Sequence, residues 1–68
     1  MDRQAVSSSN IRSVGFDNGT LEIEFNRGGV YQYYNVPEGT FRSLISAPSV
    51  GKYFHAHIKD VYHFSKIS

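Results

Sequence analysis

The sequence predicts a single small α+β domain, in which a three-stranded antiparallel β-meander is followed by two short helices and a short C-terminal extended segment. The chain has 68 residues, which is the size of one small domain. Apolar residues alternate with polar ones in its first half, as in a half-buried sheet, and recur at helical spacing after Pro37. We expect residues 1–6 to be a flexible lead-in and residues 7–68 to form the domain.

The first two strands are predicted to form a hairpin. The first strand covers Ile11 to Phe16, and the Asn18-Gly19 pair that follows it suits the positive φ angles of a tight turn. Polar and apolar residues alternate in the second strand, Thr20 to Phe25. One face carries Leu21, Ile23 and Phe25, and the other carries Glu22 and Glu24. We expect the two glutamates to face solvent, where charge deters aggregation.

A third strand is predicted from Val30 to Val36, because this stretch is rich in β-branched and aromatic residues. It follows a second chain reversal at residues 26–29. Its register has two solutions, since a slip of one residue exchanges the two faces of a strand. In one solution Gly28 is left-handed in a bulge, and Gly29 then pairs with Phe25.

This choice of register decides which tyrosines face the core. With the bulge, Tyr31 and Tyr33 lie on the core side and Tyr34 turns outward, where it is a candidate to contact a ligand. In the other register the faces are exchanged. We favour the bulge because it places the polar Gln32 beside the two glutamates of the second strand.

Two short helices are predicted next. Pro37 suits a first helical turn, the apolar Phe41, Leu44 and Ile45 recur at helical spacing, and Ala47-Pro48 ends this helix. Ser49 can cap a second helix over about Val50 to Asp60. Its apolar stripe is Phe54, Ile58 and Val61.

The tail from Tyr62 to Ile67 alternates again and is predicted to dock on the sheet as an extended segment. With five Phe, five Tyr and no Trp, the chain has the aromatic content that a small core needs. The predicted core is Val14, Phe16, Leu21, Ile23, Phe25, Tyr31, Tyr33, Phe41, Leu44, Ile45, Phe54 and Ile58.

Composition excludes several classes of protein. The chain has no Cys, which excludes disulfide scaffolds, thiolate metal sites and Cys nucleophiles. Its net charge of +1 is far from the strongly basic balance of many nucleic-acid-binding domains. It has no apolar run near the roughly 20 residues of a spanning helix, and its polar N-terminus lacks the apolar segment of a secretory signal. We expect a cytoplasmic protein with no membrane contact.

The sequence gives no catalytic or metal-binding motif. It contains no Gly-x-Ser-x-Gly elbow, no phosphate-binding glycine loop and no dinucleotide fingerprint. His55 and His57 lie two residues apart, so on a helix they point in opposite directions, whereas paired ligands lie three or four apart. His57 with Asp60 has a spacing that suits either a weak metal site or a helix-surface hydrogen bond. We expect no enzyme activity, no catalytic residues, no metal and no cofactor.

Four stretches stand in a characteristic order along the chain. They are Val6–Asp17, Leu21–Phe25, Gly28–Pro37 with its Tyr31-Gln32-Tyr33 signature, and Ser49–Lys59. Together they resemble the KTSC domain family, which is named for a module at the C-terminus of some lysyl-tRNA synthetases. The resemblance covers nearly the whole chain and implies a stand-alone member of the kind found in bacteria and phages. We expect its motif residues to be structural, and they are Tyr31, Tyr33, Gly51, Tyr53 and Phe54.

The resemblance also implies a role in RNA binding. Exposed aromatic rings stack on bases, and Arg or Lys neutralises phosphates. The leading hypothesis is therefore a non-enzymatic module that binds tRNA or single-stranded RNA. The alternative is a protein–protein interaction module that uses a sheet edge, because an edge strand accepts a partner strand. The candidate nucleic-acid-binding residues are Arg12, Arg27, Tyr34, Lys52 and Lys59.

Overall fold

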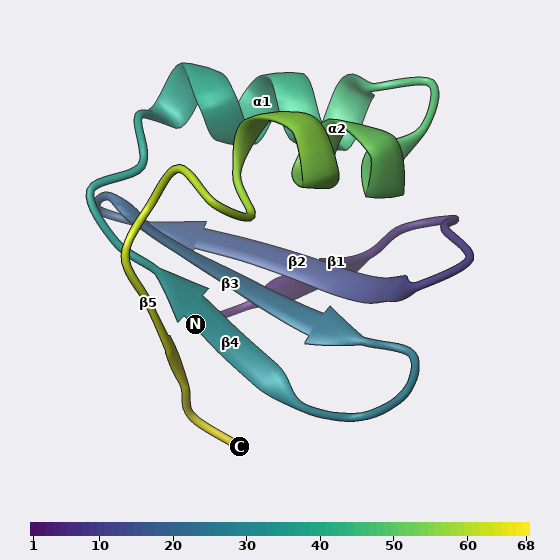
Figure 1. Ribbon diagram of the computed structural model, residues 1–68, viewed down its shortest axis with the longest axis horizontal. Helices are drawn as coiled ribbons and strands as arrows, with labels where there is room; N and C mark the ends of the chain where they lie inside the picture. The colour runs from purple at the N-terminus through teal and green to yellow at the C-terminus, as the bar shows by residue number, and fades with distance from the viewer.

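The computed structural model describes residues 1–68 and has an α+β architecture with one five-stranded sheet and two helices (Figure 1). The strands are β1 (Arg3–Ala5), β2 (Ile11–Asp17), β3 (Thr20–Phe25), β4 (Val30–Tyr33) and β5 (Phe64–Lys66). They lie in chain order, and every neighbouring pair is antiparallel. Helices α1 (Glu38–Ser46) and α2 (Val50–His57) cover one face of the sheet (Figure 1). The predicted class is right, but the sheet has five strands rather than three.

Turn chemistry sets the register of the central strands. Asn18 and Gly19 have φ angles of 49° and 86°, as a tight hairpin between β2 and β3 requires. Gly28 has φ 98°, and the Phe25 N–H donates to the Gly29 carbonyl at 3.1 Å. The predicted bulge register between β3 and β4 is therefore confirmed.

The two tyrosines of β4 consequently lie on the helix-covered face. Tyr33 pairs with Leu21, and Tyr31 pairs with Ile23. Gln32 pairs with Glu22 on the other face, as predicted.

The two outer strands extend the predicted meander. The tail docks as expected, since Phe64 of β5 pairs with Tyr33 of β4. Residues 1–6 were expected to be a flexible lead-in, but Arg3–Ala5 form the edge strand β1 and pair with β2. The physical reason lies at Gly15, because a Cβ there would stand 2.7 Å from the Asp2 carbonyl oxygen. Because Gly15 has no side chain, β1 can pack closely against β2 at this position.

The face of the sheet away from the helices carries a polar network. Glu22 was expected to face solvent, yet it is only 6% exposed. Its carboxylate accepts hydrogen bonds from Arg3 of β1 and, at 2.9 Å, from Gln32 Nε2 of β4. The Ser13 hydroxyl accepts from Arg3 Nε at 3.0 Å and donates to Glu24 Oε1 at 2.9 Å. The expectation of a solvent-facing Glu22 was wrong, because the Arg3 side chain covers it.

The second helix is shorter than predicted. Ser49 caps it as expected, with the Lys52 N–H donating to Ser49 Oγ at 3.3 Å. It ends at His57 rather than Asp60, because the chain turns there and Phe54 O accepts from the N–H groups of both Ile58 and Lys59. The turn leads the chain back to the sheet edge at β5 (Figure 1). As a result Val61, predicted to join the apolar stripe, is 62% exposed. Neither helix has the length and apolar character needed to cross a bilayer.

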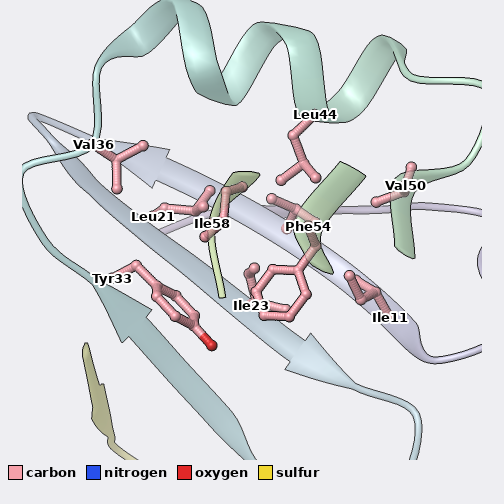
Figure 2. Close-up of a cluster of buried hydrophobic side chains, with 10 residues drawn as sticks. Ile11, Leu21, Ile23, Tyr33, Val36, Leu44, Val50, Phe54 and Ile58 are labelled. Atoms are coloured by element: carbon pink, nitrogen blue, oxygen red, sulfur yellow. The ribbon is translucent and has the colours of Figure 1, made fainter. Parts of the chain in front are cut away.

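The core lies between the two helices and the sheet (Figure 2). Every residue of the predicted core is either buried there or packed partly buried against it. Three further hydrophobic residues are buried that were not predicted to belong to the core, namely Ile11, Val36 and Val50. Each lies at the beginning of a strand or helix or in a connection, where a periodic pattern is too short to reveal burial.

We expect Gly15→Ala to lower the free energy of unfolding by about 1–2 kcal/mol, because the new methyl group overpacks against the backbone of residue 2. Urea denaturation measures the effect, and amide hydrogen exchange locates it in β1. Gly39→Ala is the matched control, since a Cβ there meets no atom within 4 Å and Gly39 lies inside α1. This control should stabilise the chain by about 0.5–1 kcal/mol. Equal effects of both variants would contradict the placement of β1.

Candidate nucleic-acid interface

A groove of about 450 Å³ opens between α2, the turn after it, the β3–β4 hairpin and β5. We call it the tyrosine groove. The residues that line it are Asn10, Phe25, Arg27, Gly28, Tyr31, Tyr33, Phe54, His55, Lys59, Asp60 and Phe64. They come from the segment before β2, from the end of β3, from β4, α2 and β5, and from the connections after β3 and α2; none lies in β1, β2 or α1. The sequence therefore places an aromatic surface and several charged groups around one opening.

Aromatic rings form the wall of the tyrosine groove. The Tyr33 ring is 4% exposed and packs edge-on against Phe54, with ring centroids 5.5 Å apart. Phe64 of β5 lies 5.6 Å from Tyr33 and 5.9 Å from Tyr31, measured between ring centroids. Because Phe64 is 54% exposed, it presents a ring on which a planar ligand can stack.

The Tyr33 hydroxyl is the polar end of a mostly buried side chain. Figure 2 shows it pointing away from Val36. Burial raises the pKa of Tyr33 to about 12, and the neighbouring Tyr31 and Asp60 act in the same direction. The hydroxyl therefore keeps its proton at neutral pH. It donates to no protein group and is not sealed from solvent, so it is free to donate to a ligand in the groove.

Unpaired charges surround the opening of the tyrosine groove. Arg27, Lys59 and Asp60 all line it, and none of them takes part in an ion pair. The ion pairs of the structure lie elsewhere, joining Arg3 to Glu22 and Glu24, and Arg42 to Glu38. Two cations and one carboxylate are thus available to an incoming molecule.

A second, shallower groove of about 540 Å³ adjoins the first along α2. It is lined by Lys52, and it shares Asn10 and His55 with the tyrosine groove. Gly51 also lines it, and a Cβ at Gly51 would stand 2.6 Å from Asn10 Oδ1. Because Gly51 has no side chain, the loop before β2 can pack against the first turn of α2, and the two segments together line the second groove.

The structure brings together three of the five residues predicted to bind nucleic acid. Arg27 and Lys59 share the tyrosine groove, and Lys52 lies in the adjoining one. Tyr34 lies on the opposite face of the sheet, where its hydroxyl donates to Gln32 Oε1 at 3.3 Å. Arg12 is exposed on β2 and lines neither groove. Tyr34 and Arg12 therefore do not belong to the surface that the other three share.

Four of the five family-motif residues line the two grooves, namely Tyr31, Tyr33, Gly51 and Phe54. Tyr33 and Phe54 are buried, and Tyr31 and Tyr53 are partly buried against the core. The Tyr53 ring also lies 4.4 Å from the ring of His57, between centroids. No group of three His, Asp or Glu side chains lies close enough to hold a metal ion.

Four polar or aromatic lining residues were predicted neither as core nor as binding residues, namely Asn10, His55, Asp60 and Phe64. The alternation of the tail was the one available signal for Phe64, because a tail docked beside β4 brings every second side chain next to the tyrosines. Asp60 was assigned to a helix that in fact ends at His57.

Comparison with known proteins agrees with this fold and its motifs. A family model described as the KTSC domain matches residues 7–62. The chain belongs to the KTSC domain family. The crystal structure of a KTSC domain protein from Yersinia pestis superposes with a TM-score of 0.95 at 45% identity, and the match covers 98% of this chain and 97% of that one.

Two kinds of KTSC relative are similar in sequence. One is an uncharacterised protein of Stutzerimonas stutzeri, 39% identical over 61 residues, which are 87% of this chain and 86% of that protein. The other is the lysine–tRNA ligase of Trichormus variabilis, 43% identical over 49 residues. That match spans 72% of this chain but only 9% of the ligase. The KTSC fold therefore occurs both as a small separate chain and as a segment of a much larger enzyme.

Proposed function

We propose that this KTSC domain is a non-enzymatic module that binds single-stranded RNA, including unpaired stretches of tRNA, in the cytoplasm. The observation that carries the proposal is the tyrosine groove, where an exposed ring and two unpaired cations meet at one opening. Single-stranded nucleic acid is bound by this combination, since bases stack on aromatic rings while Arg and Lys neutralise the phosphates.

The charge of the surface supports the same proposal. The whole chain has a net charge of only +1, so a uniformly basic surface does not exist. Three of the seven Lys and Arg side chains, Arg27, Lys52 and Lys59, line the two adjoining grooves. A strand that enters the tyrosine groove and continues along α2 meets all three in turn. The similarity to a segment of a lysine–tRNA ligase gives a context in which RNA is the ligand of the larger protein.

A protein partner is the second candidate, and the open sheet edges favour it. Both edge strands, β1 and β5, consist entirely of exposed residues. Exposed main-chain groups on such a strand can pair with an added strand. This mode of binding depends little on salt, whereas phosphate binding weakens steeply as salt rises.

The double variant Arg27→Ala/Lys59→Ala should lower affinity for a fluorescent oligouridine by about tenfold at low salt, because two phosphate contacts are lost. The slope of log K against log salt should fall by about 0.7 for each contact removed. Fluorescence anisotropy at several salt concentrations measures both quantities.

Arg12→Ala is the matched control for this experiment, since it removes one exposed cation outside both grooves. It should leave affinity within about twofold of the original chain, because a distant surface charge is screened. A loss of affinity in Arg12→Ala as large as that in Arg27→Ala alone or Lys59→Ala alone would show that general charge, and not the groove, holds the RNA. No binding by the unaltered domain at low salt would exclude RNA as the ligand and leave the sheet-edge hypothesis.

A further inference from the structure

Asp60 is out of place in a groove that only binds phosphates. It is the one carboxylate among the residues that line the tyrosine groove, and the other charged ones are Arg27 and Lys59. It pairs with neither cation and takes part in no side-chain hydrogen bond within the protein. Asp60 is exposed at the opening, and because a free carboxylate repels a phosphate and accepts hydrogen bonds, it favours a part of the ligand that donates them.

The groups beside Asp60 define the chemistry of that part of the ligand. An ionised carboxylate only accepts hydrogen bonds, and its two oxygens can take two neighbouring donors. The unpaired Tyr33 hydroxyl and the Lys59 ammonium, both lining the same groove, donate. Asp60 and Tyr33 line the same groove, and the Asp60 charge is the smallest of the three influences that raise the pKa of Tyr33. The groove thus presents acceptors beside donors next to the exposed ring of Phe64.

Among the four RNA bases, only guanine has an edge that can occupy both carboxylate oxygens of Asp60 and a neighbouring donor at once. Its N1–H and N2 amino group are adjacent donors, and its O6 beside them is an acceptor. Uracil offers one donor between two acceptors, whereas adenine and cytosine present an acceptor beside their amino group. In single strands these edges are free to be read. A cavity of about 450 Å³ has room for one such base with its sugar.

We propose that the tyrosine groove selects guanine in single-stranded RNA, with Asp60 accepting from N1–H and the N2 amino group, the Tyr33 hydroxyl donating to O6, and the base stacking on Phe64. This inference rests on the proposed function and names the base that the groove prefers. Arg27 then holds a phosphate beside the bound nucleotide.

The test compares three labelled six-residue oligonucleotides by fluorescence anisotropy. One is oligouridine, the second carries a single central guanosine, and the third carries inosine, which lacks the N2 amino group, at that position. The guanosine oligonucleotide should bind about tenfold more tightly than oligouridine, and inosine should lose most of that gain. Equal binding of all three would overturn the selection of guanine while leaving RNA binding by the groove intact. No binding of any of them would overturn both proposals.

Asp60→Asn tests the residue that makes the selection. The preference for guanosine should disappear, while oligouridine should bind at least as tightly as before, because a repulsive charge near the phosphates has been removed. A merely structural role for Asp60 would weaken binding of all three oligonucleotides equally. Asp17→Asn is the matched control, since it removes the same charge at the exposed end of β2, away from both grooves. A preference that survives in Asp60→Asn, or one that is lost equally in Asp17→Asn, would overturn the proposal.

Discussion

Tyr33→Ala should lower the free energy of unfolding by about 3–5 kcal/mol, the loss typical of removing a large aromatic side chain from a core. The Tyr33 ring is 4% exposed and lies beside both Phe54 and Phe64. Truncation removes its buried area and both ring contacts, and it leaves a space between the sheet and α2 that these rings do not fill. Urea denaturation followed by circular dichroism measures the change.

Tyr33→Phe separates the two roles that the structure gives this residue. The hydroxyl makes no hydrogen bond with protein, so its removal should change stability by less than about 0.5 kcal/mol. The ring contacts with Phe54 and Phe64 remain. A loss below about 1 kcal/mol in Tyr33→Ala would place the ring outside the core and contradict the register of β4. A large loss in Tyr33→Phe would mean that the hydroxyl has a partner within the protein.

The register of the central sheet was predictable because local chemistry specifies it. A left-handed Gly28 selects one bulge, and the bulge selects which side Tyr31 and Tyr33 face. The alternation of β3 independently required the same pairing, since any slip would have placed Gln32 among apolar side chains. Where two local signals agree in this way, the sequence alone decides the structure.

Strand β1 was not predictable, because nothing local marks it. Arg3, Gln4 and Ala5 form a short polar stretch with no apolar alternation. The residues that hold the strand are distant in sequence. Gly15 has no side chain and so leaves room for β1, and the buried Glu22 carboxylate accepts a hydrogen bond from Arg3. Alternation correctly placed Glu22 on the face away from the helices, but it could not reveal that a residue 19 positions earlier covers that face.

The candidate interface was predicted in part for a similar reason. Arg27 and Lys59 were chosen separately as exposed cations, and only the folded chain shows that they share a groove. Phe64 depended on the docking of β5 beside β4, and Asp60 depended on where α2 ends. Sequence patterns give the face on which a side chain lies. The meeting of side chains from a hairpin, a helix end and a terminal strand is a property of the tertiary structure.

Glu22→Gln should lower the free energy of unfolding by about 2 kcal/mol near neutral pH, because the charge-assisted hydrogen bonds that join β1, β3 and β4 are weakened. Urea denaturation compares it with Glu38→Gln, which removes the same charge from an exposed pair with Arg42. That control should lose less than about 0.5 kcal/mol, as exposed pairs within a helix do. A similar decrease in the free energy of unfolding in both variants would mean that the buried hydrogen bonds of Glu22 stabilise the fold no more than the exposed Glu38–Arg42 pair does.

The pH dependence identifies the carboxylate itself as the source of this stability. Hydrogen bonds from Gln32 and Arg3 hold the pKa of Glu22 below its ordinary value of 4.5, against the opposing effect of burial. The unfolded chain therefore takes up the proton first as pH falls. The stabilisation by the Glu22 carboxylate is complete above about pH 4.5. It is lost as the pH falls through the lower pKa of Glu22 in the folded state. Since other carboxylates titrate in the same range, the informative quantity is the difference between the original chain and Glu22→Gln, which should shrink steadily below about pH 4.5. A difference that stays constant down to about pH 3 would show that the charge of Glu22 does not hold β1 in place.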